Sequence, residues 1–270
     1  VILKSRNRLD KNIAINLNSV GAMLPYMPFH YLLFDKLKTK ALIYTSGNIS
    51  DEPIVIDNVK AKNVFNNLTD AILTYNREIY NRLDDSVVII VNNKERLVRR
   101  SRGYVPQPIS LKKNVDDIIA CGAELKNTFC IGKGNLAYIS QHIGDLKNID
   151  TYDFYVESIE KFNKLFKVKP EIYVTDIHPE YLSTKYAQNS KNKIMQVQHH
   201  HAHITSCMAE NNLDEDVIGV ALDGIGYGED GNIWGGEFFI CNLSEYKRYM
   251  HFEYIPVPGG DKAAEEPWRM

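Results

Sequence analysis

Residues 117–139 read DIIACGAELKNTFCIGKGNLAYI and contain three short apolar segments separated by turn residues. The segments are Ile118–Gly122, Thr128–Ile131 and Leu136–Ile139. Short apolar runs between turn residues are typical of strands, so this stretch predicts three consecutive strands.

The residues that follow predict two more helix–strand pairs. An amphipathic helix is predicted over Tyr152–Phe166, followed by a strand over Ile172–Thr175. A second helix is expected from about Glu180 to Asn189, before a strand over Ile194–Val197. The apolar face of the first helix is expected to contain Phe154, Ile159, Phe162, Leu165 and Phe166. Three strands followed by helix, strand, helix and strand indicate an actin-like or ribonuclease-H-like α/β domain.

The first part of the chain predicts a separate α/β unit. Strands are expected at Ala41–Thr45 and Ser86–Val91, and Asn92-Asn93 is expected to turn the second strand into a hairpin partner at Arg96–Arg100. We therefore divide the chain into an α/β domain over residues 1–109, a linker over 110–116 and the actin-like domain over 117–270.

Composition narrows the class of protein. The formal net charge of −2 over 270 residues gives no general attraction to nucleic acid or to an anionic membrane. No apolar run approaches the roughly 20 residues that span a bilayer. The four cysteines have no CxxC spacing, which argues against a zinc ribbon or a disulfide scaffold. These features indicate a cytoplasmic enzyme, and the non-Met start suggests a fragment of a longer protein.

A run of histidines follows the last predicted strand. Four of the five residues 199–203 are histidine, and His199 and His203 are four positions apart. On a helix both rings leave the same face, as two ligands of one divalent ion do, whereas His200 and His201 point elsewhere. The alternative is a polar helix start with incidental histidines. We favour a metal site held by His199 and His203.

A glycine-rich segment ends another apolar strand. Val217–Leu222 is predicted to be a buried strand, and Asp223-Gly224-Ile225-Gly226-Tyr227-Gly228 is predicted to turn out of it. Glycines let backbone amides approach phosphate oxygens, and an aspartate at a strand end can hold a metal ion. The alternative is an ordinary hairpin with a long turn.

Three further loops contain groups suited to a nucleotide. Lys126 and Asn127 lie in the first turn of the second domain, where actin-like folds contact phosphate. Ser46, Asn48 and Ser50 follow a predicted strand and can bind an acyl group or a phosphate. The arginines of Arg99-Arg100-Ser101-Arg102-Gly103 can hold a triphosphate, although such runs are also common on solvated edge strands.

These segments together resemble the hydrogenase-maturation carbamoyltransferases of the HypF type. The first half is similar to the back half of their YrdC-like domain, and the second half to the front of their actin-like transferase domain. The segments that carry the resemblance are Thr45–Pro53, Asn76–Ile79, Asp84–Val87, Arg99–Pro106, Cys121–Asn127, Ser140–Leu146, Asp176–Ser183, Gln198–Glu210, Asp223–Glu237 and Pro258–Asp261.

The resemblance implies a specific chemistry. Carbamoyl phosphate and ATP would form carbamoyl-adenylate in the YrdC-like domain, and the carbamoyl group would pass to the C-terminal cysteine of a HypE-type partner. His199 and His203 would bind zinc or iron, with magnesium expected beside the ATP. The resemblance assigns nucleotide or adenylate binding to Ser46, Asn48, Ser50, Ser86, Arg100, Arg102, Lys126, Asp223, Gly224, Gly226 and Gly228. It identifies no catalytic residue within the chain.

The sequence also departs from the family pattern. The acylphosphatase-like and zinc-finger segments and the first half of the YrdC-like domain are not in the chain, and the third metal ligand, an aspartate, is expected beyond Met270. Two enzyme alternatives remain: an O-carbamoyltransferase acting on a small-molecule hydroxyl, and the tRNA threonylcarbamoyladenosine enzymes, which usually separate the two folds. A non-catalytic nucleotide-binding scaffold is the alternative from another class.

Overall fold

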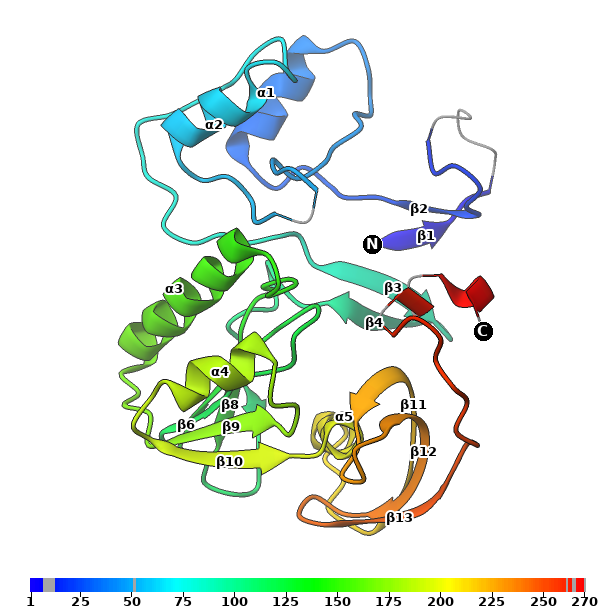
Figure 1. Ribbon diagram of the computed structural model, residues 1–270. Coiled ribbons are helices and arrows are strands. Elements are labelled where there is room, and N and C mark those ends of the chain that lie inside the picture. Colours follow the sequence, from blue (N-terminus) through cyan, green and yellow to red (C-terminus); the bar gives the residue numbers. More distant parts are fainter. Residues whose placement is uncertain (7–12, 51, 261, 264–265, 270) are drawn as a thin grey trace. The chain divides into compact units, whose positions relative to one another are not determined.

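The computed structural model (Figure 1) describes residues 1–6, 13–50, 52–260, 262–263 and 266–269. Asp51 and Asp261, which belong to two of the segments quoted above, lie outside the described residues. The chain forms two compact units, one of residues 1–107 with 140–158 and one of residues 108–139 with 159–270. No described helix is long and apolar enough to cross a membrane.

The first unit contains a four-stranded sheet in the order β2-β1-β3-β4. Its strands are β1 (Ile2–Lys4), β2 (Ser19–Gly21), β3 (Val87–Val91) and β4 (Lys94–Arg99), and its helices are α1 (Pro28–Lys36) and α2 (Asn58–Phe65). The predicted hairpin is confirmed. Asn92 and Asn93 have φ angles of 51° and 60°, which a two-residue turn between twisted strands requires.

The strand predicted at Ala41–Thr45 is wrong, because this segment has no regular structure. Leu42 is 40% exposed and Ile43 is 82% exposed, and no described strand pairs with the segment. An apolar run forms a strand only where a neighbouring strand pairs with its backbone N–H and C=O groups. The local composition of the run does not predict whether such a neighbour is present.

Residues 140–158 are held to the first unit by polar contacts. The backbone N–H of His142 donates to the carbonyl of Arg100 over 3.1 Å. Arg82 pairs with Glu157 at 2.6 Å and stacks over the ring of Phe154. Helix α3 (Ile149–Phe166) therefore begins in the first unit, and its residues from Ile159 onward belong to the second.

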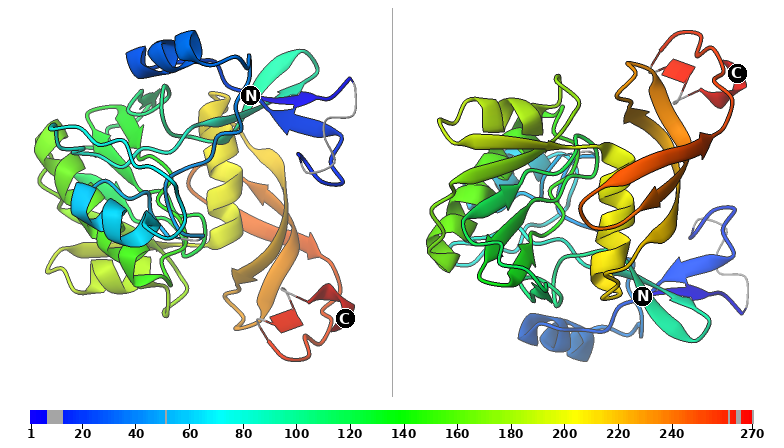
Figure 2. Two further views of the ribbon diagram at one scale, coloured as in Figure 1. Left: turned by 90° about the horizontal axis from the view of Figure 1, so that it is seen from above. Right: turned by 90° about the horizontal axis from the view of Figure 1, so that it is seen from below.

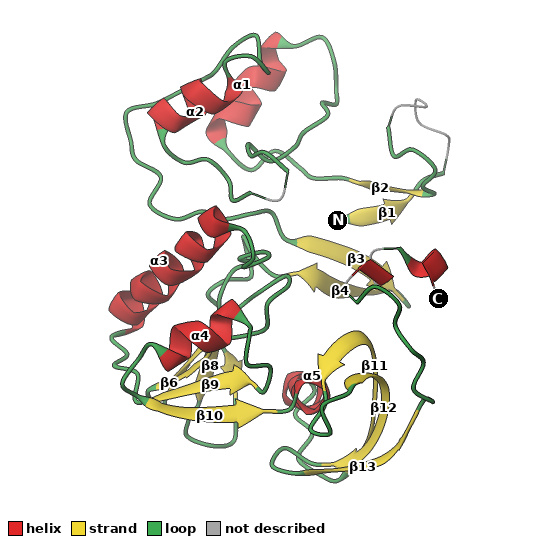
Figure 3. Ribbon diagram, viewed as in Figure 1, coloured by secondary structure: helices red, strands yellow, loops and turns green. Residues whose placement is uncertain are grey.

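The second unit is built on a six-stranded sheet in the order β10-β9-β6-β7-β8-β5, which Figure 3 shows in yellow. Its strands are β5 (Ile109–Ser110), β6 (Ile118–Ala120), β7 (Cys130–Lys133), β8 (Leu136–Ile139), β9 (Ile172–Asp176) and β10 (Lys193–Val197). Strands β6, β9 and β10 are parallel, and β6, β7, β8 and β5 are antiparallel. Helix α4 (Leu182–Gln188) connects β9 to β10. The predicted order of strands and helices is confirmed.

Buried apolar side chains join α3 to this sheet. Ile119 and Ile131 are fully buried, and the rings of Phe129 and Phe162 meet edge to face at 5.1 Å. Burial of large aromatic rings stabilises a core through both area and ring geometry. The apolar face predicted for α3 is correct except at Leu165, which is 65% exposed.

The rest of the second unit consists of α5 (His199–Glu210) and a three-stranded sheet of β11 (Val217–Tyr227), β12 (Ile233–Cys241) and β13 (Tyr246–His251), followed by a short 3₁₀ helix at Pro267–Arg269. Both views of Figure 2 show α5 against one face of this sheet. Ile204 occupies the space that a side chain at Gly219 would need. Ile204, Met208 and Phe239 belong to the buried cluster between helix and sheet.

The predicted turn at residues 223–228 is wrong in its position. Strand β11 continues to Tyr227, with a register shift between Leu222 and Gly226 in its pairing to β12. The chain reverses later, where the backbone N–H of Gly231 donates to the carbonyl of Gly228. The glycines allow the irregular pairing, so Asp223 lies in the irregular part of a strand rather than in a loop.

Candidate metal centre

Helix α5 starts directly at the histidine run. The side chain of Gln198 caps the helix, since its Oε1 accepts a hydrogen bond from the backbone N–H of His201 over 2.9 Å. His199 and His203 lie one turn apart, and their Nε2 atoms are separated by 3.2 Å. The predicted helical arrangement of this pair is confirmed.

Asp223 joins the two histidines. Its Oδ2 lies 2.8 Å from the Nε2 of His199 and 3.6 Å from the Nε2 of His203. Among the described residues, these three side chains form the group that can hold a metal ion. The family resemblance assigned Asp223 to nucleotide binding and implied a third metal ligand beyond Met270. The structure instead places a carboxylate of this chain beside both histidines.

The spacing of the three ligand atoms suits a divalent ion. Ligand atoms on a tetrahedral zinc ion, each about 2.0–2.1 Å from the metal, lie roughly 3.3 Å apart. The observed separations of 2.8, 3.2 and 3.6 Å bracket that value. The Oδ2 of Asp223 is also buried, and it faces the Nε2 atoms of both histidines. Two imidazole nitrogens and a carboxylate oxygen are ligands that zinc and iron both accept, so the donor set fits the implied metal.

The electrostatics of His199 favour a cation at the same place. Its Nδ1 lies 2.6 Å from Oδ2 of Asp176, while its Nε2 faces Asp223. Contact with Asp176, and then with Asp223, raises the pKa of the metal-free His199 to about 9. Contact with His199, and then with His203, holds the pKa of Asp223 well below its usual range. Without a metal, a proton on His199 supplies the positive charge that the two carboxylates attract.

The two remaining histidines of the run have structural contacts. His200 is fully buried, its Nδ1 lies 3.1 Å from Nε2 of Gln198, and burial lowers its pKa. The Nε2 of His201 lies 2.8 Å from the carbonyl oxygen of Asn242. The prediction that these rings point away from the pair is correct. The Nε2 of His200 still comes within 3.9 Å of Oδ2 of Asp223.

Asp176 was not predicted as a site residue. It is the last residue of β9 and pairs in register with Val197, the last residue of β10, immediately before the cap of α5. Carboxyl ends of adjacent parallel strands meet at one edge of a sheet. The signal was therefore available in the sequence: an aspartate ends one predicted parallel strand, and the histidines follow the next.

Comparison with known proteins gives the family. Three family models match the chain: Telomere recombination, which represents YrdC-like domains, over residues 1–101; HypF Kae1-like domain over 113–210; and Carbamoyltransferase, Kae1-like Domain, second subdomain over 219–270. The Carbamoyltransferase HypF of Synechocystis sp. is 43% identical over the whole chain. The chain belongs to the HypF carbamoyltransferase family.

Solved HypF structures have the same fold. A full-length HypF in its phosphate- and nucleotide-bound form matches 99% of the chain with a TM-score of 0.93 and 48% identity. The HypF of T. kodakarensis matches 97% with a TM-score of 0.91 and 43% identity. The chain covers 36% and 35% of these two proteins and 36% of the Synechocystis relative. The predicted α/β fold, YrdC-like and then actin-like, is confirmed.

In the YrdC-like part, three predicted adenylate-site residues bind their own loop. The Oγ of Ser86 donates to the carbonyl of Arg102 and accepts from the N–H of Ser101. Arg100 donates to the carbonyls of Tyr104 and Gln107. Arg102 donates to the carbonyl of Leu83 and lies 3.4 Å from the carboxylate of Asp85. The structure thus brings Ser86, Arg100 and Arg102 together and gives each a loop-stabilising contact.

The second YrdC-like group, Ser46, Asn48 and Ser50, lies in a separate exposed loop. Asn48 donates to the carbonyls of Ile49 and Glu52, which closes that loop. In the Kae1-like part, Lys126 is exposed in the turn after β6, at a φ of 49°.

The three predicted glycines have different surroundings. A side chain at Gly226 would meet the ring of His200, and one at Gly228 would meet Trp234. Gly224 has open space around it, and its N–H donates to the Oδ1 of Asp223 over 2.7 Å. Gly224 therefore orients the candidate ligand, whereas the other two glycines make room for packed rings.

Proposed function

We propose that the protein is a carbamoyltransferase of nickel–iron hydrogenase maturation. It would form carbamoyl-adenylate and pyrophosphate from carbamoyl phosphate and ATP in the YrdC-like domain, with magnesium beside the nucleotide. The carbamoyl group would then pass to the C-terminal cysteine of a HypE-type protein. One observation carries the proposal: a YrdC-like and a Kae1-like domain follow one another along this chain as they do in HypF relatives.

The proposed metal site consists of His199, His203 and Asp223 and would hold zinc or iron. A bound divalent ion supplies Lewis-acid polarisation of a carbonyl or phosphoryl oxygen. The ligand residues orient their donor atoms toward one point, and Gly224 fixes the carboxylate through its N–H. A HypF relative has been solved in a phosphate- and nucleotide-bound form, which supports nucleotide binding as part of the proposed activity.

The acceptor thiol is proposed to come from the partner. In this chain Cys121 and Cys241 are buried, Cys130 is half-buried and Cys207 is exposed, and burial raises the pKa of the Cys241 thiol. A buried thiol with a raised pKa is a poor nucleophile, since the thiolate is the reactive form. A partner cysteine at a mobile C-terminus avoids that restriction. We place the reaction in the cytoplasm, where its substrates carbamoyl phosphate and ATP are made.

The first experiment measures release of pyrophosphate from ATP by the full-length protein, with and without carbamoyl phosphate. The companion is the double variant His199→Ala/His203→Ala. We expect release to depend on carbamoyl phosphate in both proteins, because adenylate formation is assigned to the YrdC-like domain. Release without that dependence contradicts the carbamoyl-adenylate mechanism. Nucleotide binding without turnover favours a scaffold, and transfer to a small-molecule hydroxyl favours an O-carbamoyltransferase.

A further inference from the structure

Asp176 contacts two different donors with its two carboxylate oxygens. Its Oδ2 lies 2.6 Å from the Nδ1 of His199, and its Oδ1 accepts from the backbone N–H of His178 over 2.8 Å. The Asp176 side chain is 6% exposed and that of His199 is 12% exposed. Both contacts are therefore shielded from water, where charge-assisted hydrogen bonds are strongest.

We infer that Asp176 is a positioning residue that fixes His199 in the tautomer a metal ion requires and ties this ligand to the turn at His178. The inference rests on the metal site of the proposed function. A neutral imidazole has one N–H and one lone pair, and a carboxylate at Nδ1 places the N–H there. The Nε2 lone pair is then left for the metal, on the side where His203 and Asp223 lie.

The backbone makes this arrangement rigid. Asp176 and Val197 are paired in register at the ends of β9 and β10, and His199 follows only two residues later at the start of α5. The Asp176 carboxylate therefore comes from one strand and the histidine from the next element. Rotation of the His199 ring would place its C–H groups where the nitrogens now lie, against Asp176 and Asp223.

Because Asp176 uses both carboxylate oxygens as acceptors, its replacement by asparagine has a specific expected effect. Asparagine has nearly the same volume as aspartate but only one oxygen acceptor, and its NH₂ group is a donor. The two donors face different oxygens of Asp176, and in Asp176→Asn one of these positions becomes an NH₂ group, so the remaining oxygen faces either the N–H of His178 or the N–H of His199. If the oxygen keeps the hydrogen bond from the backbone N–H of His178, the NH₂ group of the asparagine donates to the Nδ1 of His199. The proton then moves to Nε2, and the lone pair needed for the metal is lost.

The test measures zinc affinity of the full-length protein by competition with a chromophoric chelator. Loss of a carboxylate partner from a ligating histidine costs about 10–100-fold in metal affinity, and we expect that loss for Asp176→Asn. The matched control is Asp216→Asn, the same chemical change at an exposed carboxylate of the same unit, whose Oδ1 accepts from the side chain of Asn242. We expect the control to stay within about twofold of the unsubstituted protein. Equal affinity of Asp176→Asn and the unsubstituted protein overturns the inference.

A second measurement needs no variant and therefore does not depend on folding of Asp176→Asn. In the zinc-loaded protein, nitrogen NMR of the histidine rings should show His199 bound through Nε2, with a slowly exchanging proton on Nδ1. Coordination through Nδ1 would overturn the inference. Failure of the unsubstituted protein to bind zinc would also overturn it. Pyrophosphate release tests the carbamoyl-adenylate proposal separately, because that step is assigned to the other domain.

Discussion

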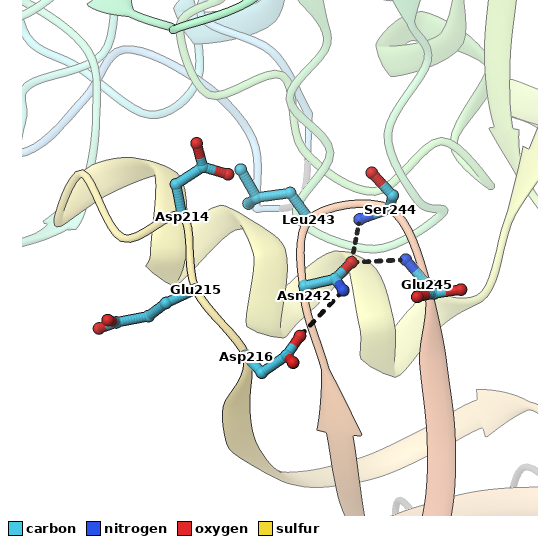
Figure 4. Close-up of a pocket in the computed structure, with 7 residues that line it drawn as sticks. All are labelled: Asp214, Glu215, Asp216, Asn242, Leu243, Ser244 and Glu245. Atoms are coloured by element: carbon cyan, nitrogen blue, oxygen red, sulfur yellow. Dashed lines mark hydrogen bonds between the residues drawn. The ribbon is translucent and has the colours of Figure 1, made fainter.

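Two clusters of polar side chains can be compared among the described residues of the second unit, and one of them has the geometry of a metal site. The metal site joins His199, His203 and Asp223. The second cluster, which we call the acidic hollow, is lined by Asp214, Glu215, Asp216, Asn242, Leu243, Ser244 and Glu245 (Figure 4).

The difference lies in where the oxygens point. In the hollow, the side chains of Asp214 and Glu215 point apart, and Asn242 binds the backbone N–H groups of Ser244 and Glu245 (Figure 4). Asn242 thus stabilises the turn of the hollow, and it also donates to Oδ1 of Asp216. At the metal site, by contrast, the buried Oδ2 of Asp223 faces the Nε2 atoms of two imidazole rings. A high density of charge does not by itself make a metal site, whereas ligand atoms that converge from different elements do.

The largest expected effect is a loss of zinc affinity in His199→Ala, and it tests the difference between the metal site and the acidic hollow. His199→Ala removes a ligand atom and leaves the two carboxylates of Asp176 and Asp223 without their shared cation. We expect zinc affinity to fall by more than the roughly 100-fold that loss of an outer partner costs. Chelator competition measures it, with Asp214→Ala from the hollow as the control. Equal loss in both variants would mean that the hollow contributes to the site.

The second expected effect is a dependence of zinc affinity on pH. Metal-free His199 has a pKa of about 9, raised above the ordinary value by Asp176 and then Asp223. Zinc must displace that proton, so apparent affinity should rise about tenfold per pH unit between pH 7 and 9, then level off. The same raised pKa means that the pair stabilises the metal-free fold below pH 6.5 and that this stabilisation is lost as pH rises through 9.

Competition titrations at several pH values provide the check. In Asp176→Asn the pKa of residue 199 should fall, because its largest cause is removed, and the plateau should begin at lower pH. An affinity that stays constant from pH 7 to 9 would show that no proton is displaced from His199.

The third expected effect concerns packing behind the site. In Gly226→Ala the new methyl group would lie 2.3 Å from a ring carbon of His200, which is fully buried. Overpacking a buried contact typically costs about 1–3 kcal/mol of the free energy of unfolding. Gly224→Ala is the matched control on the same strand, since nothing lies within 4 Å of its added carbon. Urea unfolding of the two variants measures the difference, and equal stabilities would contradict the packing role of Gly226.

The sequence predicted the strands and the helix that surround the metal site better than it predicted which residues form the site. The strands ending at Asp176 and Val197 and the helix that starts at His199 follow from apolar patterning and spacing. Asp223 was assigned to a phosphate-binding turn, because a glycine-rich segment after a strand reads as a loop. The observed position of Asp223 depends on the register shift in β11. That shift is a feature of the pairing between β11 and β12. The strand expected at Ala41–Thr45 was wrong for a similar reason, since pairing is not a local property.

The smallest expected effect is a change in the free energy of unfolding when the exposed ion pair of the acidic hollow is removed. The Nζ of Lys112 lies 3.3 Å from Oδ2 of Asp214, and their side chains are 61% and 42% exposed. Solvent and salt screen such a pair, so Lys112→Ala should change the free energy of unfolding by less than about 1 kcal/mol. Zinc affinity should not change, because neither residue directs an atom at the metal site. Thermal unfolding at low and high salt and one chelator titration would check both statements. A change in zinc affinity here would show that the negative charge of the hollow acts on the metal site over a distance, and would weaken the contrast between the two clusters.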